Sequence, residues 1–448
     1  MKKVGMLSLG CAKNLVDSEV MLGELRREGY SFTNNAEEAD VVIVNTCGFI
    51  DKAKEESIDA ILEMAELKKQ GKVEKVIVSG CLSQRYHEEL AEEMPEVDLF
   101  LGINHVGQIR NFMDDLRDQE TRDTHSDWRP DFLYDASYDR VLTTPSHSAY
   151  VKISEGCDHV CSFCIIPGLR GKHRSRTIDD IVTEVTRLGE QGIKEVNLVA
   201  QDSTYYGRDL DYKDGLAQLL EALAQVPTIS WVRVHYMYPY QVSDRLLEVM
   251  HTHSKLCSYL DMPLQHCDRA VLSSMKRGSG RPHLEKFLDR IRKGLPDATL
   301  RSSFIVGFPG EDERAFQELC DFVTQQRFDY IGVFTYSLEE GTTAHPLGDP
   351  IPTEVKEARK AKLLTIQKEI SKEKLTHNIG KTFDVMVEGV HPETELLLRG
   401  RYQGQAPEVD GEVFITEGTW QPGDIIPVKI EETFDYDMAG RVIGGMDV

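Results

Sequence analysis

The stretch EGCDHVCSFC, residues 155–164, decides how the rest of this 448-residue chain is interpreted. It places Cys157, Cys161 and Cys164 at the spacing CxxxCxxC, directly after an apolar run that predicts a β-strand over residues 150–154. Three thiolates so close together can bind three corners of a 4Fe-4S cube, because cysteine is the usual ligand of such clusters. No fourth cysteine lies nearby, so one iron would keep the open coordination site that a catalytic metal centre requires.

Working outward, five further apolar runs alternate with amphipathic helical patterns after this first strand. Six strand-and-helix units of this kind predict a partial (β/α) barrel over residues 149–376, with its active site at the carboxyl ends of the strands. The expected strands cover residues 150–154, 196–200, 231–235, 259–264, 300–307 and 331–336.

Two further domains flank the barrel, so the fold class is α/β. Residues 1–120 alternate short apolar runs (4–9, 41–44 and 76–78) with helical patterns (18–27 and 54–69), which predicts an open parallel sheet covered by helices. A polar stretch over residues 121–148 reads as a linker. A long charged helix over residues 354–376 leads to residues 378–448, where short alternating strands broken by Gly and Pro predict a small antiparallel β-barrel.

A second cysteine triad is spread over the N-terminal domain. Cys11, Cys47 and Cys81 are far apart in sequence, yet each lies just past the end of an expected parallel strand. Parallel strands bring their carboxyl ends to one edge of the sheet, where open α/β sheets bind ligands. We therefore expect a shared iron–sulfur cluster, with three buried packing cysteines as the alternative.

Charge and cysteine content narrow the class of protein. The net charge of −23 argues against general nucleic-acid binding and favours a basic partner, or simply keeps the chain soluble. The chain has nine cysteines and no apolar run long enough to span a membrane. We therefore expect a cytoplasmic protein whose thiols bind metal rather than form disulfides. Cys257, Cys267 and Cys320 read as packing residues, and His235 and His266 as structural residues more readily than catalytic ones.

The second triad resembles the cysteine motif of the radical S-adenosylmethionine (SAM) superfamily, including the aromatic Phe163 before its last cysteine. That resemblance implies a 4Fe-4S cluster that binds SAM and cleaves it to a 5′-deoxyadenosyl radical, with the three cysteines as catalytic cluster ligands. It also implies SAM contacts after the second and fifth strands, from Gln201, Asp202, Gly307, Gly310 and Glu311. Zinc, with His159 as a fourth ligand, is the alternative, and the barrel context disfavours it.

Both triads in this domain order look like the methylthiotransferases, which combine a cluster domain, a radical SAM barrel and a C-terminal TRAM barrel. The resemblance implies two 4Fe-4S clusters, one ligated by Cys11, Cys47 and Cys81. One SAM would donate its methyl group to sulfur on that cluster, and a second would yield the radical that removes hydrogen from the substrate carbon. Both triads leave an iron open, whereas a two-cluster electron carrier, the non-enzyme alternative, usually ligates each cluster with four cysteines.

The substrate is predicted from charge and local motifs. Residues 378–448 carry 14 acidic against 5 basic side chains, a sign that repels phosphates and attracts a basic protein. The segments MLSLGCAKNLVD (6–17), NTCGFI (45–50), HYMYPY (235–240) and PLQH (263–266) resemble the branch that modifies an aspartate of ribosomal small-subunit protein twelve. A tRNA adenosine methylthiotransferase is the alternative.

The expected partners are therefore that basic protein, free or on the ribosome, and an electron donor, with nucleic-acid contact secondary. Lys152, Arg170, Lys172, Arg174 and Arg176 flank the second triad. We expect them to neutralise SAM or cluster charge or to contact ribosomal RNA, with a solvated loop as the alternative.

Overall fold

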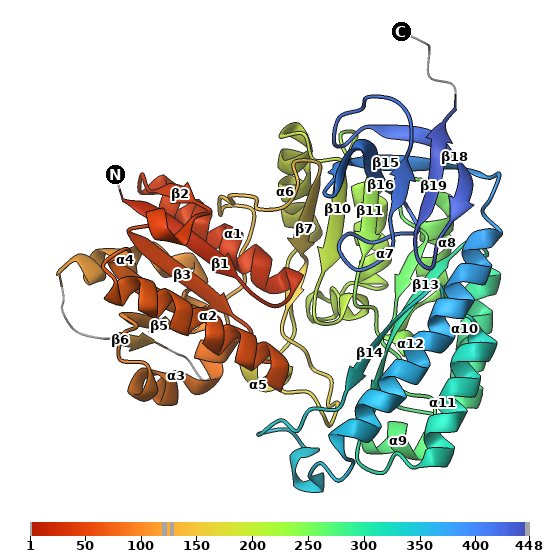
Figure 1. Cartoon of the computed structure of the whole chain (residues 1–448), viewed down its shortest axis with the longest axis horizontal. Helices are drawn as coiled ribbons and strands as arrows, with labels where there is room; N and C mark the ends of the chain where they lie inside the picture. The colour runs from red at the N-terminus through yellow and green to blue at the C-terminus, as the bar shows by residue number, and fades with distance from the viewer. Residues whose placement is uncertain (1, 119–122, 126–129, 444–448) are drawn as a thin grey trace.

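The computed structural model describes residues 2–118, 123–125 and 130–443, which form three units in chain order (Figure 1). The expected linker over residues 121–148 falls partly outside the described residues, as do the end of the predicted TRAM barrel and its Asp447. Among the helices of the described residues, none combines the length and the apolar character needed to cross a membrane.

The N-terminal unit is a parallel sheet in the order β2-β1-β3-β4-β5-β6. Its central strand β3 reads VVIVNT and is buried throughout, because β-branched residues suit a strand that is covered on both faces. The strands are β1 (Lys3–Ser8), β2 (Ser31–Thr33), β3 (Val41–Thr46), β4 (Lys75–Gly80), β5 (Leu99–Leu101) and β6 (Asp123–His125). The helices are α1 (Ala12–Arg27), α2 (Asp51–Lys69), α3 (Cys81–Glu93) and α4 (Ile109–Asp118).

The central unit contains the six expected strands as two parallel three-stranded sheets, β11-β10-β7 and β12-β13-β14. Its strands are β7 (Ser148–Lys152), β10 (Glu195–Val199), β11 (Trp231–Val234), β12 (Tyr259–Asp261), β13 (Thr299–Val306) and β14 (Tyr330–Thr335), with the short pair β8 (Ser154–Glu155) and β9 (Arg174–Ser175). Its helices are α5 (Ile166–Arg170), α6 (Ile178–Glu190), α7 (Gly215–Ala224), α8 (Asp244–Thr252), α9 (Arg269–Ser274), α10 (Arg281–Gly294), α11 (Glu313–Gln326) and α12 (Thr353–Thr376).

The C-terminal unit is a closed five-stranded barrel formed by β15 (Thr382–His391), β16 (Thr394–Tyr402), β17 (Val413–Ile415), β18 (Ile425–Thr433) and β19 (Met438–Val442). The prediction of a wholly antiparallel barrel is wrong in one detail, because β17 and β19 pair in parallel. A ring with an odd number of strands cannot alternate direction throughout, so closure requires at least one parallel pair.

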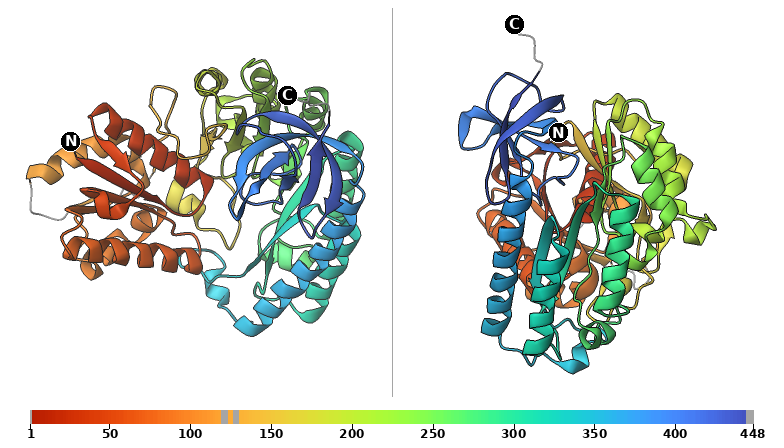
Figure 2. Two further views of the ribbon diagram at one scale, coloured as in Figure 1. Left: turned by 45° about the horizontal axis from the view of Figure 1, so that its top comes forward. Right: turned by 90° about the vertical axis from the view of Figure 1, so that its right-hand side faces the viewer.

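Buried ion pairs hold the C-terminal barrel on the central unit. Glu195, the first residue of β10, accepts hydrogen bonds from Arg401 of β16 and from Arg233 of β11. Tyr259, the first residue of β12, donates a hydrogen bond of 2.6 Å to Asp410. These contacts place the C-terminal barrel over the amino ends of the central strands, as Figure 2 shows. The carboxyl ends, where the second triad lies, are at the opposite end.

Candidate functional site

The loop that carries the second triad begins where β8 ends and is fixed on both sides. The Cys157 N–H donates to Gly171 O, and the Ser162 N–H and Oγ donate to the carbonyls of Met275 and Ser274 after α9. Arg277 donates to Cys161 Sγ at 3.6 Å. Hydrogen bonds to sulfur of this kind adjust the potential of an iron–sulfur cluster, so the surroundings of the loop suit such a group.

His159 lies inside this loop and is already paired. Its Nε2 is 2.5 Å from Asp202 Oδ2, and its ring stacks on Tyr238 with centroids 4.0 Å apart. In the described chain no three His, Cys, Asp or Glu side chains are close enough to bind a single metal ion. The contacts of His159 therefore disfavour zinc, whereas a cube spreads its three cysteines over three irons.

Two of the residues expected to bind SAM follow β10. Asp202 is buried and also accepts hydrogen bonds from Thr204, so it fastens the cysteine loop to this strand end. Gln201 donates from Nε2 to Glu155 Oε1 at 2.6 Å, while its buried Oε1 has no partner among the described residues. The free amide oxygen of Gln201 fits a polar ligand, and SAM contact by both residues stays a prediction.

The GFPGE segment, residues 307–311, follows β13 as expected. Gly307 and Gly310 have φ of +78° and +93°, a region that favours glycine, so these positions turn the chain sharply. The buried Glu311 carboxylate accepts a hydrogen bond from the Gly307 N–H and lies 3.5 Å from Arg359. Glu311 therefore holds this loop, and SAM contacts by the segment stay a prediction.

The first triad lies where the sequence predicts it. Cys11 caps α1 after β1, Cys47 follows β3 directly, and Cys81 follows β4 directly. The strands β1, β3 and β4 are neighbours and parallel, so the three cysteines share the carboxyl edge of the sheet. A Cβ at Gly10, whose φ is +90°, would come within 2.7 Å of Cys47 Cβ. Glycine there lets the cysteine loops touch each other.

Charge and burial shift the pKa values of Cys11 and Cys47 in opposite directions. Burial alone raises the pKa of Cys11, but the charges of Lys13 and Arg170 outweigh it and bring the pKa below its ordinary value. Burial and the neighbouring Cys81 raise the pKa of Cys47 to about 12. Cluster ligands must be deprotonated, so Cys11 is the thiol of this triad most ready to bind.

The pKa values of two thiols of the second triad, Cys157 and Cys164, are raised. Burial is the main cause, and it raises the pKa of Cys157 to about 11 and that of Cys164 to about 12. The charges of the other two thiols of the triad add to the shift at Cys164, which shows that the three lie close together. A positively charged cluster would reverse this shift by favouring the thiolates.

Arg170 of α5 connects the two triads. From its position just after the second triad, it reaches Cys81 Sγ at 3.4 Å and Asn14 Oδ1 at 2.9 Å. Its other nitrogen donates to Asp17 at 3.0 Å and to Glu155 at 2.9 Å. One buried guanidinium thus ties the first cysteine edge to the start of the second cysteine loop.

The alternative of a solvated loop is wrong for three of the five basic residues that flank the second triad. Arg170 is buried as described, Lys152 is buried and pairs with Asp17 and Glu155, and Arg176 is buried and pairs with Asp180. Ion pairing with carboxylates explains their burial. Lys172 is exposed and Arg174 is partly exposed.

The residues that sequence reasoning missed lie on α1 and at the strand ends. Asn14 and Asp17 are buried and accept hydrogen bonds from Arg170. Both precede residue 18, near which α1 was expected to begin. Their spacing of three residues puts both side chains on one helix face. Polar residues at that spacing are the feature of the sequence that could have revealed them. Cys257, Cys267 and Cys320 are buried packing residues, as predicted.

The two histidines noted in the sequence are also buried. His235 lies 3.2 Å from Asn197 Oδ1 and 3.9 Å from Asp261 Oδ2. His266 accepts a hydrogen bond from the Asp268 N–H and lies 3.8 Å from Glu311. These contacts fit the structural role that was favoured for both.

Three parts of the chain match known protein families. Residues 3–102 match a family described as uncharacterized protein family UPF0004, residues 151–323 the radical SAM superfamily, and residues 379–443 the TRAM domain. The ribosomal protein uS12 methylthiotransferase RimO of Myxococcus xanthus is 50% identical over 442 residues, which cover 99% of this chain and 92% of that protein. The chain belongs to the RimO family. It is thus a radical SAM methylthiotransferase, and its superfamily implies SAM and a 4Fe-4S cluster.

Other members of the RimO family extend the likeness. The RimO proteins of Koribacter versatilis and Syntrophotalea carbinolica are 45% and 47% identical, over 99% and 100% of this chain and 96% and 98% of their own. Among solved structures, the radical SAM methyltransferase TsrM from Kitasatospora setae matches with a TM-score of 0.56 at 13% identity, covering 77% of each chain. At that identity the TsrM likeness shows the fold alone.

Proposed function

We propose that this protein attaches a methylthio group to the β-carbon of an aspartate in ribosomal protein uS12, using two 4Fe-4S clusters and two SAM molecules. The observation that supports the proposal most strongly is the link that Arg170 forms between the two cysteine segments. The first cysteine edge and the second cysteine loop share the buried Arg170, so groups bound there would lie within one site. Full-length identity to the RimO proteins supports uS12 as the substrate.

The residues present fit the two clusters. Cys157, Cys161 and Cys164 would hold one, and Cys11, Cys47 and Cys81 the other. The cluster held by Cys157, Cys161 and Cys164 would supply the electron that cleaves SAM to the 5′-deoxyadenosyl radical, and the cluster held by Cys11, Cys47 and Cys81 would carry the sulfur that becomes the methylthio group. A separate electron donor is required, and the reducing cytoplasm suits the reduced thiols.

The chain itself binds and positions the reactants. Arg277 and Arg170 donate hydrogen bonds to Cys161 and Cys81 and so stabilise their thiolates. Gln201 Oε1, which has no hydrogen-bond partner in the described part of the chain, is available to a SAM donor group, and the Asp202–His159 pair keeps the cysteine loop in register with β10. The N-terminal unit packs against α5 and β7 through its helices α3 and α1.

A cavity of about 360 Å³ lies between the C-terminal barrel and the amino end of β7. Its wall includes Tyr150 from inside the central barrel. Five carboxylates line it, from Glu388, Glu408, Asp410, Glu412 and Asp437. Three of them are already neutralised, because Glu388 pairs with Arg401, Glu412 with Arg399 and Asp410 with Arg301. The remainder keep the cavity acidic, which suits a basic loop of a ribosomal protein.

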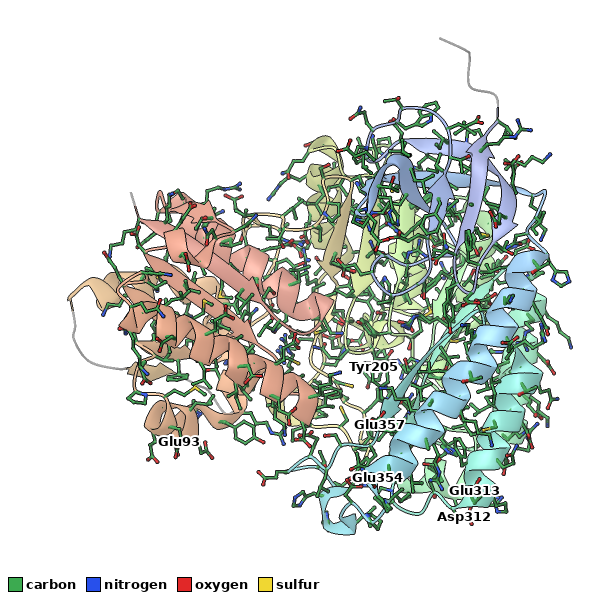
Figure 3. All side chains as sticks on the ribbon, in the orientation of Figure 1. Glu93, Tyr205, Asp312, Glu313, Glu354 and Glu357 are labelled. Atoms are coloured by element: carbon green, nitrogen blue, oxygen red, sulfur yellow. The ribbon has the colours of Figure 1, made fainter. Side chains whose placement is uncertain are left out.

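Exposed side chains on the surface of the protein also carry negative charge. Glu393, Glu395 and Glu417 of the C-terminal barrel are exposed and have no ion pair within the described chain. At the carboxyl end of the central barrel, exposed carboxylates lie at the starts of α11 and α12, from Asp312, Glu313, Glu354 and Glu357 (Figure 3). Both ends of the molecule thus attract a basic protein and repel phosphates.

The direct test is anaerobic turnover with SAM, a reductant and sulfide, offering purified uS12 and unmodified tRNA in parallel. Mass spectrometry then shows which one gains a methylthio group. The proposal expects the gain on a single aspartate of uS12. A gain on tRNA adenosine instead would overturn the substrate and keep the family, and cleavage of SAM with no gain on either would overturn both candidate substrates.

A further inference from the structure

The Lys13 side chain extends from the first triad towards the central unit, which carries the second triad. Lys13 is the second residue of α1 and follows Cys11 by two positions. Its Nζ lies 3.5 Å from the ring centroid of Tyr236, which comes after β11 at the carboxyl end of the central barrel. Both side chains are half-buried, so each keeps a surface that a ligand can reach.

The ammonium of Lys13 has no carboxylate partner within the described chain, and its charge acts on the Cys11 thiol, whose pKa it lowers. None of the described carboxylates lies within 4.0 Å of it, and its contact is the face of the Tyr236 ring. The neighbouring cations differ, because Lys152 and Arg170 each pair with Asp17 and Glu155. Withdrawing an ammonium from water without a counter-charge is costly, and such groups concentrate at functional sites.

Tyr236 is held in an uncommon conformation beneath this ammonium. Its φ is +58°, in the left-handed region that residues with a side chain seldom adopt. The Tyr236 N–H donates to Asp261 Oδ2 at 3.3 Å, which helps to fix the turn. Backbone strain of this kind persists where it positions a functional group, and here it presents the ring to Lys13.

A line of aromatic contacts joins Lys13 to the cavity beneath the C-terminal barrel. Tyr150 forms part of that cavity, and its ring centroid is 6.3 Å from that of His235. The His235 centroid is in turn 6.0 Å from that of Tyr236. Tyr150 and His235 are buried, so packed rings rather than an open surface connect this cavity to Lys13.

We propose that Lys13 binds the carboxylate of the substrate aspartate and so selects an acidic side chain for methylthio transfer. The proposal rests on the proposed function, which makes an aspartate the substrate. The Tyr236 ring holds the ammonium on one side, and the carboxylate supplies its anionic partner on the other. The β-carbon is bonded to the carboxyl carbon, so this ion pair fixes the reacting atom between the two triads.

The test is a double-mutant cycle on binding. The cluster-loaded protein and SAM, without reductant, are titrated with uS12 and with uS12 whose modified aspartate is changed to asparagine. We expect wild type to bind the aspartate form about 10- to 100-fold more tightly than the asparagine form, as a charge-assisted hydrogen bond predicts. In Lys13→Met this preference disappears, in Lys13→Arg part of it returns, and in the exposed control Lys52→Met it is unchanged.

The alternative role of Lys13 is to balance charge on the group held by the first triad. That role predicts an altered reduction potential, measured by electron paramagnetic resonance, with an unchanged preference for aspartate in Lys13→Met. Such a result overturns the proposal. If wild type binds neither form of uS12, the proposed function fails as well, whereas tight binding of both forms with equal affinity overturns only the role of Lys13.

Discussion

Arg170 shows how single residues connect parts of the chain that are distant in sequence. Its guanidinium contacts Cys81 and Asp17 in the N-terminal unit and Glu155 in the central unit, all away from water. A planar cation with several fixed donors suits this position, because it can satisfy four acceptors at once. Nothing in the local sequence around residue 170 reveals partners that lie 89 and 153 positions away.

Replacing Arg170 with Met is predicted to destabilise the cluster-free protein by about 3–5 kcal/mol, because Asp17 and Glu155 would then share only the charge of Lys152. Urea unfolding measures the change. The exposed neighbour provides the control, since Lys172→Met is expected to stay within about 0.5 kcal/mol of wild type. Equal stability of the Arg170 and Lys172 variants would show that the buried network contributes little.

At the scale of elements, strands were predictable wherever β-branched runs are buried on both faces. The six central strands and the carboxyl-edge position of Cys11, Cys47 and Cys81 follow from such runs. The start of α1 was not predictable in this way, because its polar Asn14 faces a buried ion network rather than solvent. The parallel β17–β19 pair also escaped prediction, since it arises from closure of the barrel.

The β10–β16 contact gives a test at this scale. Glu195→Gln is predicted to destabilise the cluster-free protein by about 3–5 kcal/mol at neutral pH, because Arg233 loses its carboxylate and Arg401 keeps only Glu388. Although burial alone would raise the pKa of Glu195, Arg401 and Arg233 lower it to about 2 from an ordinary 4.5.

A carboxyl group whose pKa is lower in the folded state stabilises the protein fully above its ordinary pKa. That stability is lost as the pH falls from about 4.5 towards about 2. The difference between wild type and Glu195→Gln in unfolding free energy should therefore shrink across this range. A difference that stays constant as the pH falls would contradict the assignment of Glu195 as the charged partner.

On the scale of the whole molecule, the C-terminal barrel and the reacting groups lie at opposite ends of the central strands. Glu195 and Tyr259 fix the barrel at the amino ends, while the cysteine loop follows β8 at the other end. The acidic barrel is therefore remote from the cysteine loop, and a substrate protein bound to it would still have to reach the carboxyl ends of the strands. The composition of residues 378–448 predicts the charge of this surface but not its position.

Neutralising this surface should weaken capture of uS12 without affecting SAM cleavage. The variant Glu393→Gln, Glu395→Gln, Glu408→Gln is expected to slow association with uS12 about 10-fold at low salt and much less at high salt, because steering by exposed charges is screened. Stopped-flow binding measures the rates. The control changes Glu63, Glu92 and Glu93, which are exposed on α2 and α3 of the N-terminal unit; Glu93 is labelled in Figure 3. An equal effect in both variants would assign the slowing to net charge alone.

The central claim is that the two triads divide the reaction between them, and one measurement tests it most directly. Wild type, Cys47→Ala and Cys164→Ala are each incubated anaerobically with SAM, reductant, sulfide and uS12, and 5′-deoxyadenosine and methylthio-aspartate are quantified together. We expect both products in wild type, 5′-deoxyadenosine without methylthio-aspartate in Cys47→Ala, and neither product in Cys164→Ala. Methylthio-aspartate formed at the wild-type rate by Cys47→Ala, or 5′-deoxyadenosine formed by Cys164→Ala, would contradict it.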